Sequence, residues 1–418
     1  MEADVLVRRD YRRNDRERDA AAPAIVTAVE RRPAMRIGLN IIGLALGAWG
    51  GVETYFRNLL HYLQKVDSGN EYTLLIDDRN VAQFPLYNPS FSRRIYHFAR
   101  PSFPWFVRAA LRQALHADVL KPFLNRVPLD IIHHPFTVLN PQGLATPSVL
   151  TFWDMQQEFF PEFFSTRELR RRRRTYRPSA EDSTRIIVSS EFTKQCLVER
   201  YRIVADMIDV IYTGYGPEYR VIGDPEGLDR VRKKYGLSRP FLYYPAASWP
   251  HKNHRTLLAA LRILCDRHGF DGQLVLTGIA MQAHGDMLRD IERLGLVQRV
   301  RILGYLPYAE LPFLYNLARL MVFPSLFEGF GIPLVEAMAC GCPVVCSRAA
   351  SIPEIVGEAG VTFDPLSAED MADKVNSVWQ DDGRISDMRT RGLKRARIFD
   401  WETTARKTVA TYERASRI

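Results

Sequence analysis

The stretch from Ser325 to Val345 reads SLFEGFGIPLVEAMACGCPVV and places a carboxylate on either side of a glycine-rich turn. Glu328 precedes the turn and Glu336 follows it. Gly329 and Gly331 allow a tight turn and a close approach of the backbone to another group. A helix that begins directly after the turn would offer its free amides and the positive end of its dipole to an anion. The stretch therefore predicts a strand, an anion-binding turn and a helix.

The two glutamates need a separate explanation, because a carboxylate beside a phosphate would repel it. Carboxylates do suit sugar hydroxyls, which are good hydrogen-bond donors. One interpretation therefore places an anion at the turn and polyol groups at Glu328 and Glu336. The alternative is that one glutamate caps the turn and the other lies on a solvated helix face. The spacing alone does not decide between these two interpretations.

Strand and helix patterns alternate along the rest of the chain. Strands are expected at 35–41, 71–78, 130–135, 147–154, 185–190, 208–214, 241–246, 273–278, 300–305 and 319–325, and at the short runs PVVCS and VTFDP. Such alternation indicates parallel sheets with helices on both faces. The predicted fold class is therefore α/β, with two doubly wound Rossmann-like domains facing a central cleft. Ligands of such sheets bind at the carboxyl ends of the strands.

A chain of 418 residues is too long for one ordinary core. Residues 1–34 lack periodicity and are predicted to be a disordered arm. The first domain is expected at 35–215 and the second at 216–399, joined by the segment GYGPEYRVIGDPEG. The amphipathic segment WETTARKTVATYERA is expected to form a final helix that returns to the first domain, within residues 400–418.

The composition favours a cytoplasmic protein. No apolar run is long enough to cross a bilayer, and the first residues lack the apolar core of a secretory signal. The five cysteines do not resemble a disulfide framework. The net charge of +9 is concentrated at residues 167–177. Aromatic residues do not alternate with these arginines, so nucleic acid is not expected as a partner. An acidic substrate or the anionic inner face of the membrane is favoured instead.

Taken together, the motifs resemble those of the retaining glycosyltransferases of family 4, which have the GT-B fold. The stretch EGFGIPLVEAMACGCPVV resembles the family motif of two glutamates separated by seven residues. The segment PAASWPHKNHRTLLAA, residues 245–260, resembles the family's phosphate-binding segment, and GGVETYFRNLL, residues 50–60, its N-terminal glycine-rich loop. The resemblance extends over nearly all of residues 35–415.

The resemblance implies a donor site for a nucleoside diphosphate sugar. Glu328 would contact the hydroxyls of the donor sugar, Glu336 would bind the ribose, and Lys252 would neutralise the leaving diphosphate. The other implied donor contacts are made mainly by the backbone, at Gly50, Gly51, Gly304, Tyr305, Gly329, Phe330, Gly331 and Ile332. Each of these positions also has an interpretation without a ligand. Lys252 would be a surface lysine after a turn, Gly50 and Gly51 would form a plain strand-to-helix turn, and Gly304 would be a plain strand end.

His133 and His134 lie at the carboxyl end of an expected strand. Adjacent residues of a strand point to opposite faces, so at most one of the two faces the cleft, and His134 is the predicted one. The resemblance implies that this histidine assists the 6-hydroxyl of the donor sugar or the acceptor; a histidine packed in the core is the alternative. No metal site is predicted, because neither cysteine nor carboxylate stands at ligand spacing.

The chain departs from the family pattern at two positions. Ala246 stands where many relatives carry an arginine, and Trp153 stands where relatives often carry a histidine before the retained Asp154. Asp154 would orient the acceptor or act as its base, or it would cap a loop. Trp153 would stack on a sugar or fill the core. The sequence leaves each of these alternatives open.

Two further groups of residues attract attention. A run of arginines from Arg170 to Arg174 lies on an expected helix of the first domain. A solvated face is the default interpretation, contact with anionic lipid or a lipid diphosphate acceptor is the alternative, and a run of five is expected to cover every side of the helix. Cys340, Cys342 and Cys346 are interpreted as small packing residues.

The resemblance implies retaining transfer of a sugar, mannose from GDP-mannose as the first choice, to a glycan or lipid-linked acceptor in bacterial polysaccharide or O-antigen synthesis. UDP- and dTDP-sugars remain open as donors. No Asp-x-Asp motif is found at a suitable position, so neither an obligatory metal nor another cofactor is expected. The rival functions are a sugar-nucleotide epimerase of the same fold and a catalytically silent nucleotide-binding subunit, which the departures at Ala246 and Trp153 favour. The missing Gly-x-Gly-x-x-Gly disfavours a dehydrogenase.

Overall fold

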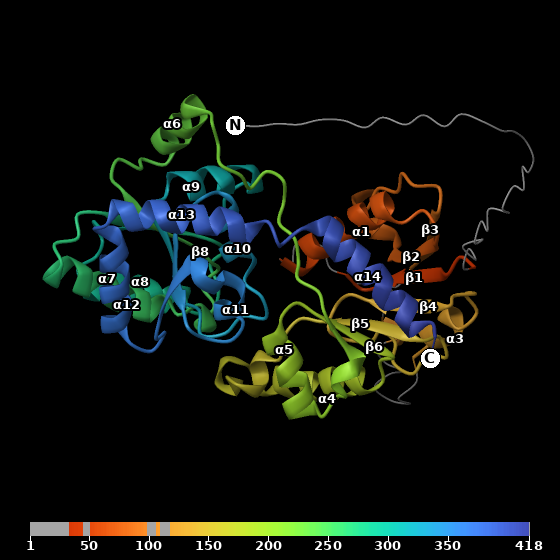
Figure 1. Cartoon of the computed structure of the whole chain (residues 1–418). Helices are drawn as coiled ribbons and strands as arrows, with labels where there is room; N and C mark the ends of the chain where they lie inside the picture. Colours follow the sequence, from red (N-terminus) through yellow and green to blue (C-terminus); the bar gives the residue numbers. More distant parts are fainter. Residues whose placement is uncertain (1–32, 45–50, 98–105, 109–117, 418) are drawn as a thin grey trace, which may run out of the picture. The chain divides into compact units, whose positions relative to one another are not determined.

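The computed structural model describes residues 33–44, 51–97, 106–108 and 118–417 (Figure 1). Its first sheet has seven strands in the order β3-β2-β1-β4-β5-β6-β7. Their bounds are β1 Arg36–Asn40, β2 Glu71–Asp77, β3 Phe91–Tyr96, β4 Ile131–His134, β5 Ser148–Phe152, β6 Arg185–Val188 and β7 Ile208–Val210. Every pair of neighbouring strands runs parallel. We call the elements around this sheet the first lobe.

The second sheet has six strands in the order β10-β9-β8-β11-β12-β13, and all of its pairs are also parallel. Their bounds are β8 Phe241–Pro245, β9 Gln273–Thr277, β10 Val300–Gly304, β11 Leu320–Phe323, β12 Val344–Ser347 and β13 Gly360–Phe363. We call the elements around this sheet the second lobe. The predicted fold class, α/β with two doubly wound parallel sheets, is confirmed.

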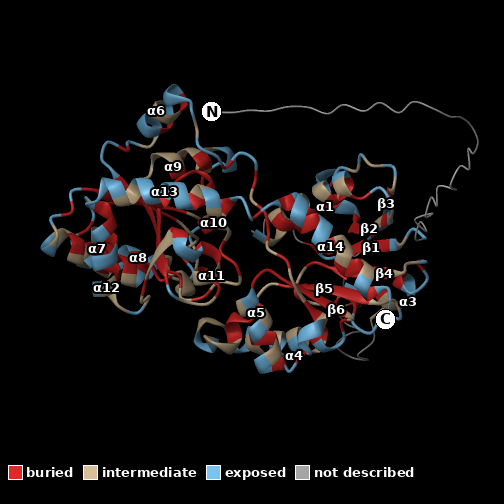
Figure 2. Ribbon diagram, viewed as in Figure 1, coloured by how far each residue is buried: buried red, intermediate tan, exposed pale blue. Residues whose placement is uncertain are grey.

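Helices follow the strands in both lobes and cover the sheets. The first lobe has α1 Gly51–Val66, α3 Leu120–Leu124, α4 Thr166–Glu181 and α5 Glu191–Cys196; the second has α6 Pro225–Lys234, α7 His254–Arg267, α8 His284–Arg293, α9 Leu311–Leu317, α10 Ile332–Ala339, α11 Ile352–Val356, α12 Ala368–Trp379 and α13 Asp382–Ala396. The strands between them are mostly buried (Figure 2). Within the residues that the structure describes, every helix falls short of the length and apolarity that crossing a bilayer demands.

Each sheet reverses its strand order at one point, between β1 and β4 in the first lobe and between β8 and β11 in the second. Loops that leave the carboxyl ends of such neighbouring strands diverge to opposite faces and leave room for a ligand. The sequence-predicted segments around Lys252 and Glu328 follow β8 and β11, so both leave the switch point of the second sheet.

The sequence analysis missed β3, whose sequence is FSRRIY. Its four middle residues are exposed and only its two end residues are buried. It is an edge strand, so it lacks the apolar run of a central strand. The sequence pattern also predicts a helix around 105–124. The structure describes residues 106–108 and 118–124 of this segment, including α3, and the remainder lies outside the described residues.

The last helix, α14 Trp401–Ala415, packs against α1 and reaches β5 and β6 of the first sheet (Figure 1). Its Tyr412 hydroxyl lies 2.8 Å from Nδ1 of His133, and Nε2 of the same imidazole lies 2.8 Å from Oγ1 of Thr151. All three side chains are buried. His133 is therefore a core residue that joins α14 to the sheet, which matches the packed alternative for this histidine.

We expect Tyr412→Phe to lower the free energy of unfolding by about 1–3 kcal/mol, because it leaves a buried imidazole nitrogen without its partner. Urea denaturation followed by circular dichroism measures the change. Tyr62→Phe is the matched control, because the Tyr62 ring stacks on Trp401 of the same helix while no hydrogen bond of its hydroxyl is seen among the described residues. An equal effect of the two substitutions would show that the His133 contact contributes nothing.

Candidate active site

The carboxyl ends of β8 and β11 bring the two predicted donor segments together. Lys252 ends a short 3-10 turn, Pro250–Lys252, after β8, and its Nζ lies 2.6 Å from Oε1 of Glu328 in the loop after β11. Both side chains are largely buried, with exposed fractions of 17% and 13%. The amide N–H of Leu326 donates to the His251 carbonyl at 2.8 Å, so the backbones of the two loops are also joined.

The pKa of the Glu328 carboxyl group is shifted in this ion pair. Burial acts to raise the pKa of Glu328, but the charge of the Lys252 ammonium and the hydrogen bond it donates outweigh burial and hold that pKa below its usual value. Burial, followed by the charge of Lys252, lowers the pKa of His251 to about 4, so His251 is neutral. In this structure the Lys252 ammonium group therefore already donates a hydrogen bond to the Glu328 carboxylate. An anion that binds at the turn has to compete with Glu328 for the ammonium group.

The turn and the helix after it have the predicted form. Gly331 has a φ of 99°, which favours glycine, and α10 begins at the next residue with Pro333 in its first turn. The Phe330 side chain is buried against Tyr212 and Phe399, so only its backbone is available to a ligand. The first amides of α10 therefore stand at the same strand ends as Lys252.

Glu336 lies one turn inside α10 and is only 6% exposed. The Tyr315 hydroxyl donates a hydrogen bond of 2.8 Å to its Oε2. Burial raises the pKa of Glu336 to about 7, although the tyrosine hydrogen bonds oppose the rise. The rings of Tyr219 and Tyr315 lie 5.9 Å apart beside it. The alternative of a solvated helix face is therefore wrong for Glu336, which is a buried carboxylate that titrates near neutrality.

The glycine-rich turn also touches the first lobe. The Gly329 carbonyl accepts hydrogen bonds from Ser190 Oγ at 2.7 Å and Ser189 Oγ at 3.3 Å, just beyond β6. A methyl group on Gly329 would overlap the carbonyl oxygen of Trp153, beyond β5, and would lie 3.2 Å from Cβ of Asp154. The turn is thus seated on the carboxyl ends of two strands of the first sheet.

A second contact between the lobes lies beside the first. The Glu354 carboxylate, from α11, accepts hydrogen bonds from the backbone N–H of Glu191 at 2.8 Å and of Phe192 at 3.1 Å. It also accepts from the Tyr212 hydroxyl at 2.9 Å. These amides are the free donors at the start of α5, so a glutamate of the second lobe caps a helix of the first.

Sequence reasoning missed Ser190 and Glu354 as residues of this region. They lie in the segments VSSEFTKQCL and SIPEIVGEAG, within the part of the chain over which the family resemblance extends. The only local signal was that Ser190 stands in front of a helix, where it caps α5 by accepting from the N–H of Thr193 at 3.2 Å. Their contacts with the other lobe join residues more than a hundred positions apart, which spacing along the chain cannot reveal.

The two histidines are both buried and have different hydrogen-bond partners. His134 Nδ1 lies 3.1 Å from the backbone N–H of Asn140 and 3.3 Å from the amide nitrogen of Asn40, so Nδ1 accepts and Nε2 carries the proton. Burial lowers the pKa of His134 to about 3, which keeps the ring neutral. No partner for its Nε2 is found in the part of the chain that the structure describes. His134 therefore offers one unused N–H at the end of β4.

Asp154 lies directly against the turn, and both interpretations of it remain compatible with its position. It caps its own loop by accepting from the N–H of Gln156 at 3.2 Å. Burial raises its pKa, with the nearby Arg172 opposing and Glu328 adding to the rise. Trp153 is half-buried and packs against the core of the first lobe, since its ring centroid lies 4.5 Å from that of Tyr55 and its Nε1 donates to the Pro135 carbonyl.

The remaining predicted residues lie further from the ion pair. Gly304 has a φ of 70° and ends β10, the edge strand, and Tyr305 after it is 74% exposed. Gly51 begins α1 with open space beside it, while Gly50 lies outside the described residues. Ala246 follows β8 and supplies no cation. The structure therefore groups Lys252, Glu328 and the turn tightly, with Asp154 against them.

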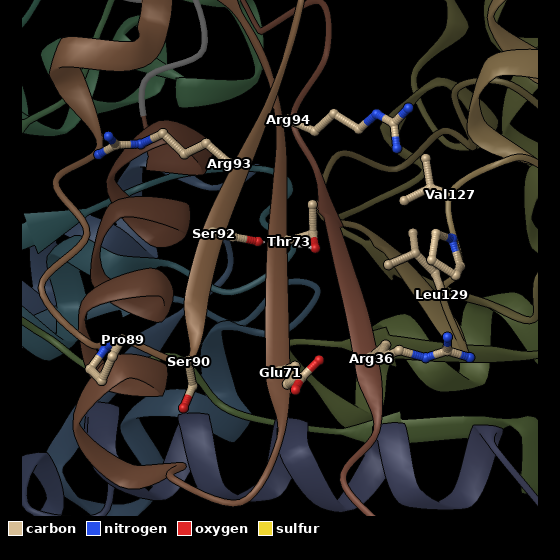
Figure 3. A pocket seen from close by; sticks show the side chains of 11 residues that line it. Arg36, Glu71, Thr73, Pro89, Ser90, Ser92, Arg93, Arg94, Val127 and Leu129 are labelled. Atoms are coloured by element: carbon tan, nitrogen blue, oxygen red, sulfur yellow. Dashed lines mark hydrogen bonds between the residues drawn. The ribbon is translucent and has the colours of Figure 1, made fainter.

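A pocket of about 760 Å³ lies elsewhere, over the amino-terminal parts of β1, β2 and β3 (Figure 3). Its lining includes Arg36, Thr73 and Arg94, and Arg36 is already paired with Asp130 at 2.7 Å. Because all strands are parallel, this pocket is at the opposite end of the sheet from the candidate site. It does not contribute to the site.

Two family models match the chain in succession. The model described as "Glycosyltransferase Family 4" matches residues 49–219, and the one described as "Glycosyl transferases group 1" matches residues 229–397. The chain is 32% identical over 285 residues to the "O-antigen chain mannosyltransferase B" of Escherichia coli, covering 68% of this chain and 74% of the relative. It is 30% identical over 237 residues to an E. coli "Serotype-specific mannosyltransferase WbdA", covering 56% of this chain but 29% of that relative.

Solved structures share the fold at low sequence identity. Anabaena Alr3699/HepE in complex with UDP and glucose has a TM-score of 0.68 at 19% identity, over 91% of this chain and 99% of that chain. Sucrose-phosphate synthase from Thermosynechococcus elongatus has a TM-score of 0.69 at 20% identity, over 91% and 98%. These likenesses support the two-lobed GT-B architecture.

We expect Gly329→Ala to destabilise the protein by about 1–3 kcal/mol, because the added methyl group overlaps the Trp153 carbonyl and forces the turn away from the first lobe. Urea denaturation measures the loss, and small-angle X-ray scattering should show an increased radius of gyration. Gly223→Ala is the control, since its methyl group would enter open space. Unchanged stability and scattering in Gly329→Ala would contradict the contact.

The buried Glu336 predicts a pH dependence of stability. Its pKa is about 7 in the folded chain against 4.5 for an ordinary glutamate, so the folded state holds a proton that the unfolded state has lost between these values. Stability contributed by this group is therefore complete below pH 4.5 and falls by about 3 kcal/mol as the pH rises through 7. Urea denaturation at several pH values should show that Glu336→Gln removes this component. The exposed Glu358→Gln should leave it, and a constant difference between wild type and Glu336→Gln would refute the shift.

Proposed function

The chain belongs to family 4 of the glycosyltransferases, and from this premise we propose that it transfers mannose from GDP-mannose to a hydroxyl group of a glycan or lipid-linked acceptor, with retention of the anomeric configuration. The observation that carries the proposal is the buried ion pair of Lys252 and Glu328 beside the start of α10. The mannosyltransferase names of two E. coli relatives support the choice of sugar. The O-antigen name of one of them supports a role in surface polysaccharide synthesis.

In this proposal the donor rearranges the ion pair. The diphosphate binds at the first amides of α10 and takes the Lys252 ammonium from Glu328. The released Glu328 carboxylate then accepts hydrogen bonds from hydroxyls of the donor sugar. Glu336, one turn inside α10, accepts hydrogen bonds from the ribose hydroxyls, and its carboxylate must be ionised to do so. The carboxylates on the two sides of the turn thus bind hydroxyl groups while the turn itself binds the anion.

The transfer step follows from the same arrangement. The bond between the anomeric carbon and the phosphate oxygen breaks, and the diphosphate leaves with the bonding electrons. The acceptor oxygen bonds to the anomeric carbon on the face that the diphosphate left, and its proton passes to a diphosphate oxygen. Lys252 and the α10 amides stabilise the negative charge that grows on the leaving group. The proposal requires neither a protein nucleophile nor an obligatory metal.

Two residues of the first lobe have supporting roles in the proposal. Asp154, which lies against the turn, orients the acceptor hydroxyl. His134 donates its unused Nε2–H to an oxygen of the donor sugar or of the acceptor. Because its ring stays neutral at physiological pH, Nδ1 continues to accept from the N–H of Asn140 and the proton stays on Nε2.

We expect GDP-mannose to raise the melting temperature while UDP- and dTDP-sugars have little effect. A ligand at a hundredfold excess over its dissociation constant adds about 2.7 kcal/mol. Lys252→Gln should abolish most of this shift, since it removes the charge while its amide can still donate to Glu328. Lys374→Gln, at an exposed position, should keep the shift.

The product of transfer provides the second readout. Nuclear magnetic resonance of the mannosylated acceptor should show the anomeric configuration of the donor, in the presence or absence of a metal chelator. A melting shift with UDP-sugars only would overturn the choice of donor, and an inverted product would overturn retention. Binding of GDP-mannose without any transfer would identify a silent nucleotide-binding subunit.

A further inference from the structure

The outer face of α4 carries an unusual excess of positive charge. The helix contains seven arginines and two glutamates in the sequence TRELRRRRRTYRPSAE. Both glutamates are engaged: Glu168 forms a capping box with Ser165, and Glu181 pairs with Arg177 at 2.7 Å. No carboxylate of the helix is therefore left to balance its remaining arginines.

The helix divides its arginine run into an inner and an outer part. Arg172 turns inward, where its guanidinium lies 4.3 Å from the ring centroid of Phe164 and donates to Oε1 of Gln157 at 3.0 Å. At about 100° per residue, the outward arginines at 167, 170, 171 and 174 fall within an arc of about 100° opposite Arg172, with Arg173 at its flank. The run from Arg170 to Arg174 therefore reaches every side of the helix, as expected, and Arg172 is the member on the inner side.

Five arginines of α4 are exposed, and their guanidinium groups form neither an ion pair nor a hydrogen bond within the described part of the chain. We call these residues the arginine face of α4: Arg167, Arg170, Arg171, Arg173 and Arg174. Figure 2 shows α4 at the outside of the first lobe, with much of its visible surface exposed.

Several exposed arginines on other helices of this protein lie beside a carboxylate. Arg289 pairs with Asp286, Arg293 with Asp290, Arg391 with Asp387 and Arg406 with Glu402, each three or four positions away along its helix. On the arginine face, the residues three and four positions apart are arginines themselves. Each like-charge pair at such spacing costs about 0.2–0.5 kcal/mol. An ordinary solvated face has no reason to accumulate this repulsion, whereas a face that meets an anionic partner does.

We propose that the arginine face of α4 docks this protein on an anionic lipid bilayer. The guanidinium groups project from a convex helix along about 10 Å of its axis, which suits a broad surface of anionic headgroups better than a single phosphate. Each arginine near such a surface contributes about 1 kcal/mol. No aromatic side chain interleaves with the arginine face, as the stacking of single-stranded nucleic acid would require.

The docking is electrostatic and reversible. The apolar side of α4 is already used inside the protein, because Ser179 and Ala180 are buried and the Tyr176 ring packs 5.9 Å from that of Phe152. The helix therefore has no apolar face left to insert among acyl chains. Binding that rests on exposed charges alone weakens as salt screens them.

Docking through α4 would place the candidate site near the membrane, which would serve the proposed function and rests on it. The positive charge of Arg172, on the inner side of α4, acts to lower the pKa of Asp154 beside the candidate site. A helix with its side chains is about 10–12 Å thick, so the bilayer would lie close to the acceptor side of the site. An acceptor anchored in the membrane could then present its hydroxyl to Asp154 while its anchor stays in the lipid. The docking itself requires no transfer activity.

The test is sedimentation of the full chain with vesicles. Binding is expected to vesicles of phosphatidylcholine and phosphatidylglycerol in equal parts, but not to phosphatidylcholine alone, and to disappear at about 1 M salt, where the screening length is about 3 Å. Glutamine replaces arginine with little change in helix propensity. At about 1 kcal/mol per residue, four such replacements should weaken binding roughly a thousandfold. The test variant combines Arg170→Gln, Arg171→Gln, Arg173→Gln and Arg174→Gln.

A matched control removes the same charge from exposed positions of the second lobe and should bind vesicles nearly as the wild type does. It combines Arg230→Gln, Arg232→Gln, Lys394→Gln and Arg397→Gln. The test variant should keep its circular dichroism spectrum and its melting shift with GDP-mannose, so the docking can fail or hold independently of the proposed function. Vesicle binding by the test variant equal to that of the wild type, or binding to uncharged vesicles, would overturn the proposal. So would retention of the wild type on nucleic acid in place of anionic vesicles.

Discussion

The ion pair between Lys252 and Glu328 is the interaction on which the candidate site depends. It joins the loops that follow β8 and β11, at the switch point of the second sheet, and it is largely withdrawn from water. Removing one partner of a buried pair leaves an uncompensated charge, which typically costs about 3–5 kcal/mol. A ligand therefore gains access to the ammonium group only by offering an anion in place of the carboxylate. The contact with Lys252 fixes the position of the Glu328 carboxylate and lowers its pKa.

The segment that holds this ion pair also holds the two lobes together. Gly329, next to Glu328, receives hydrogen bonds from Ser189 and Ser190, and nearby Glu354 caps the start of α5. Movement of Glu328 away from Lys252 therefore affects backbone that is shared with the first lobe. The residue that pairs with Lys252 and the residue whose carbonyl contacts the first lobe are thus consecutive in the chain.

Local patterns were sufficient to predict the fold and the grouping of Lys252 with Glu328, because strand–helix alternation fixes parallel sheets and both residues follow neighbouring strand ends. Strand β3 was missed because its exposed edge position removes the apolar signal. The partner of His133, the contact of Trp153 with Tyr55 and the cap from Glu354 could not be predicted, since each depends on residues brought together by tertiary packing. The division of the arginine run at Arg172 depended on where the aromatic rings of the first lobe lie.

The attachment of α14 to the first lobe has a consequence for how the protein is made. Tyr412 completes the polar contacts of His133 inside the first lobe, yet it is encoded after every strand of the second. During translation the ribosome therefore exposes the first lobe without its closing helix while the whole second lobe is synthesised. Domains commonly fold in the order in which they emerge. The first lobe therefore emerges first but cannot complete its packing until α14 has been synthesised. Until then chaperones would encounter the first lobe with the surface that α14 later covers still exposed.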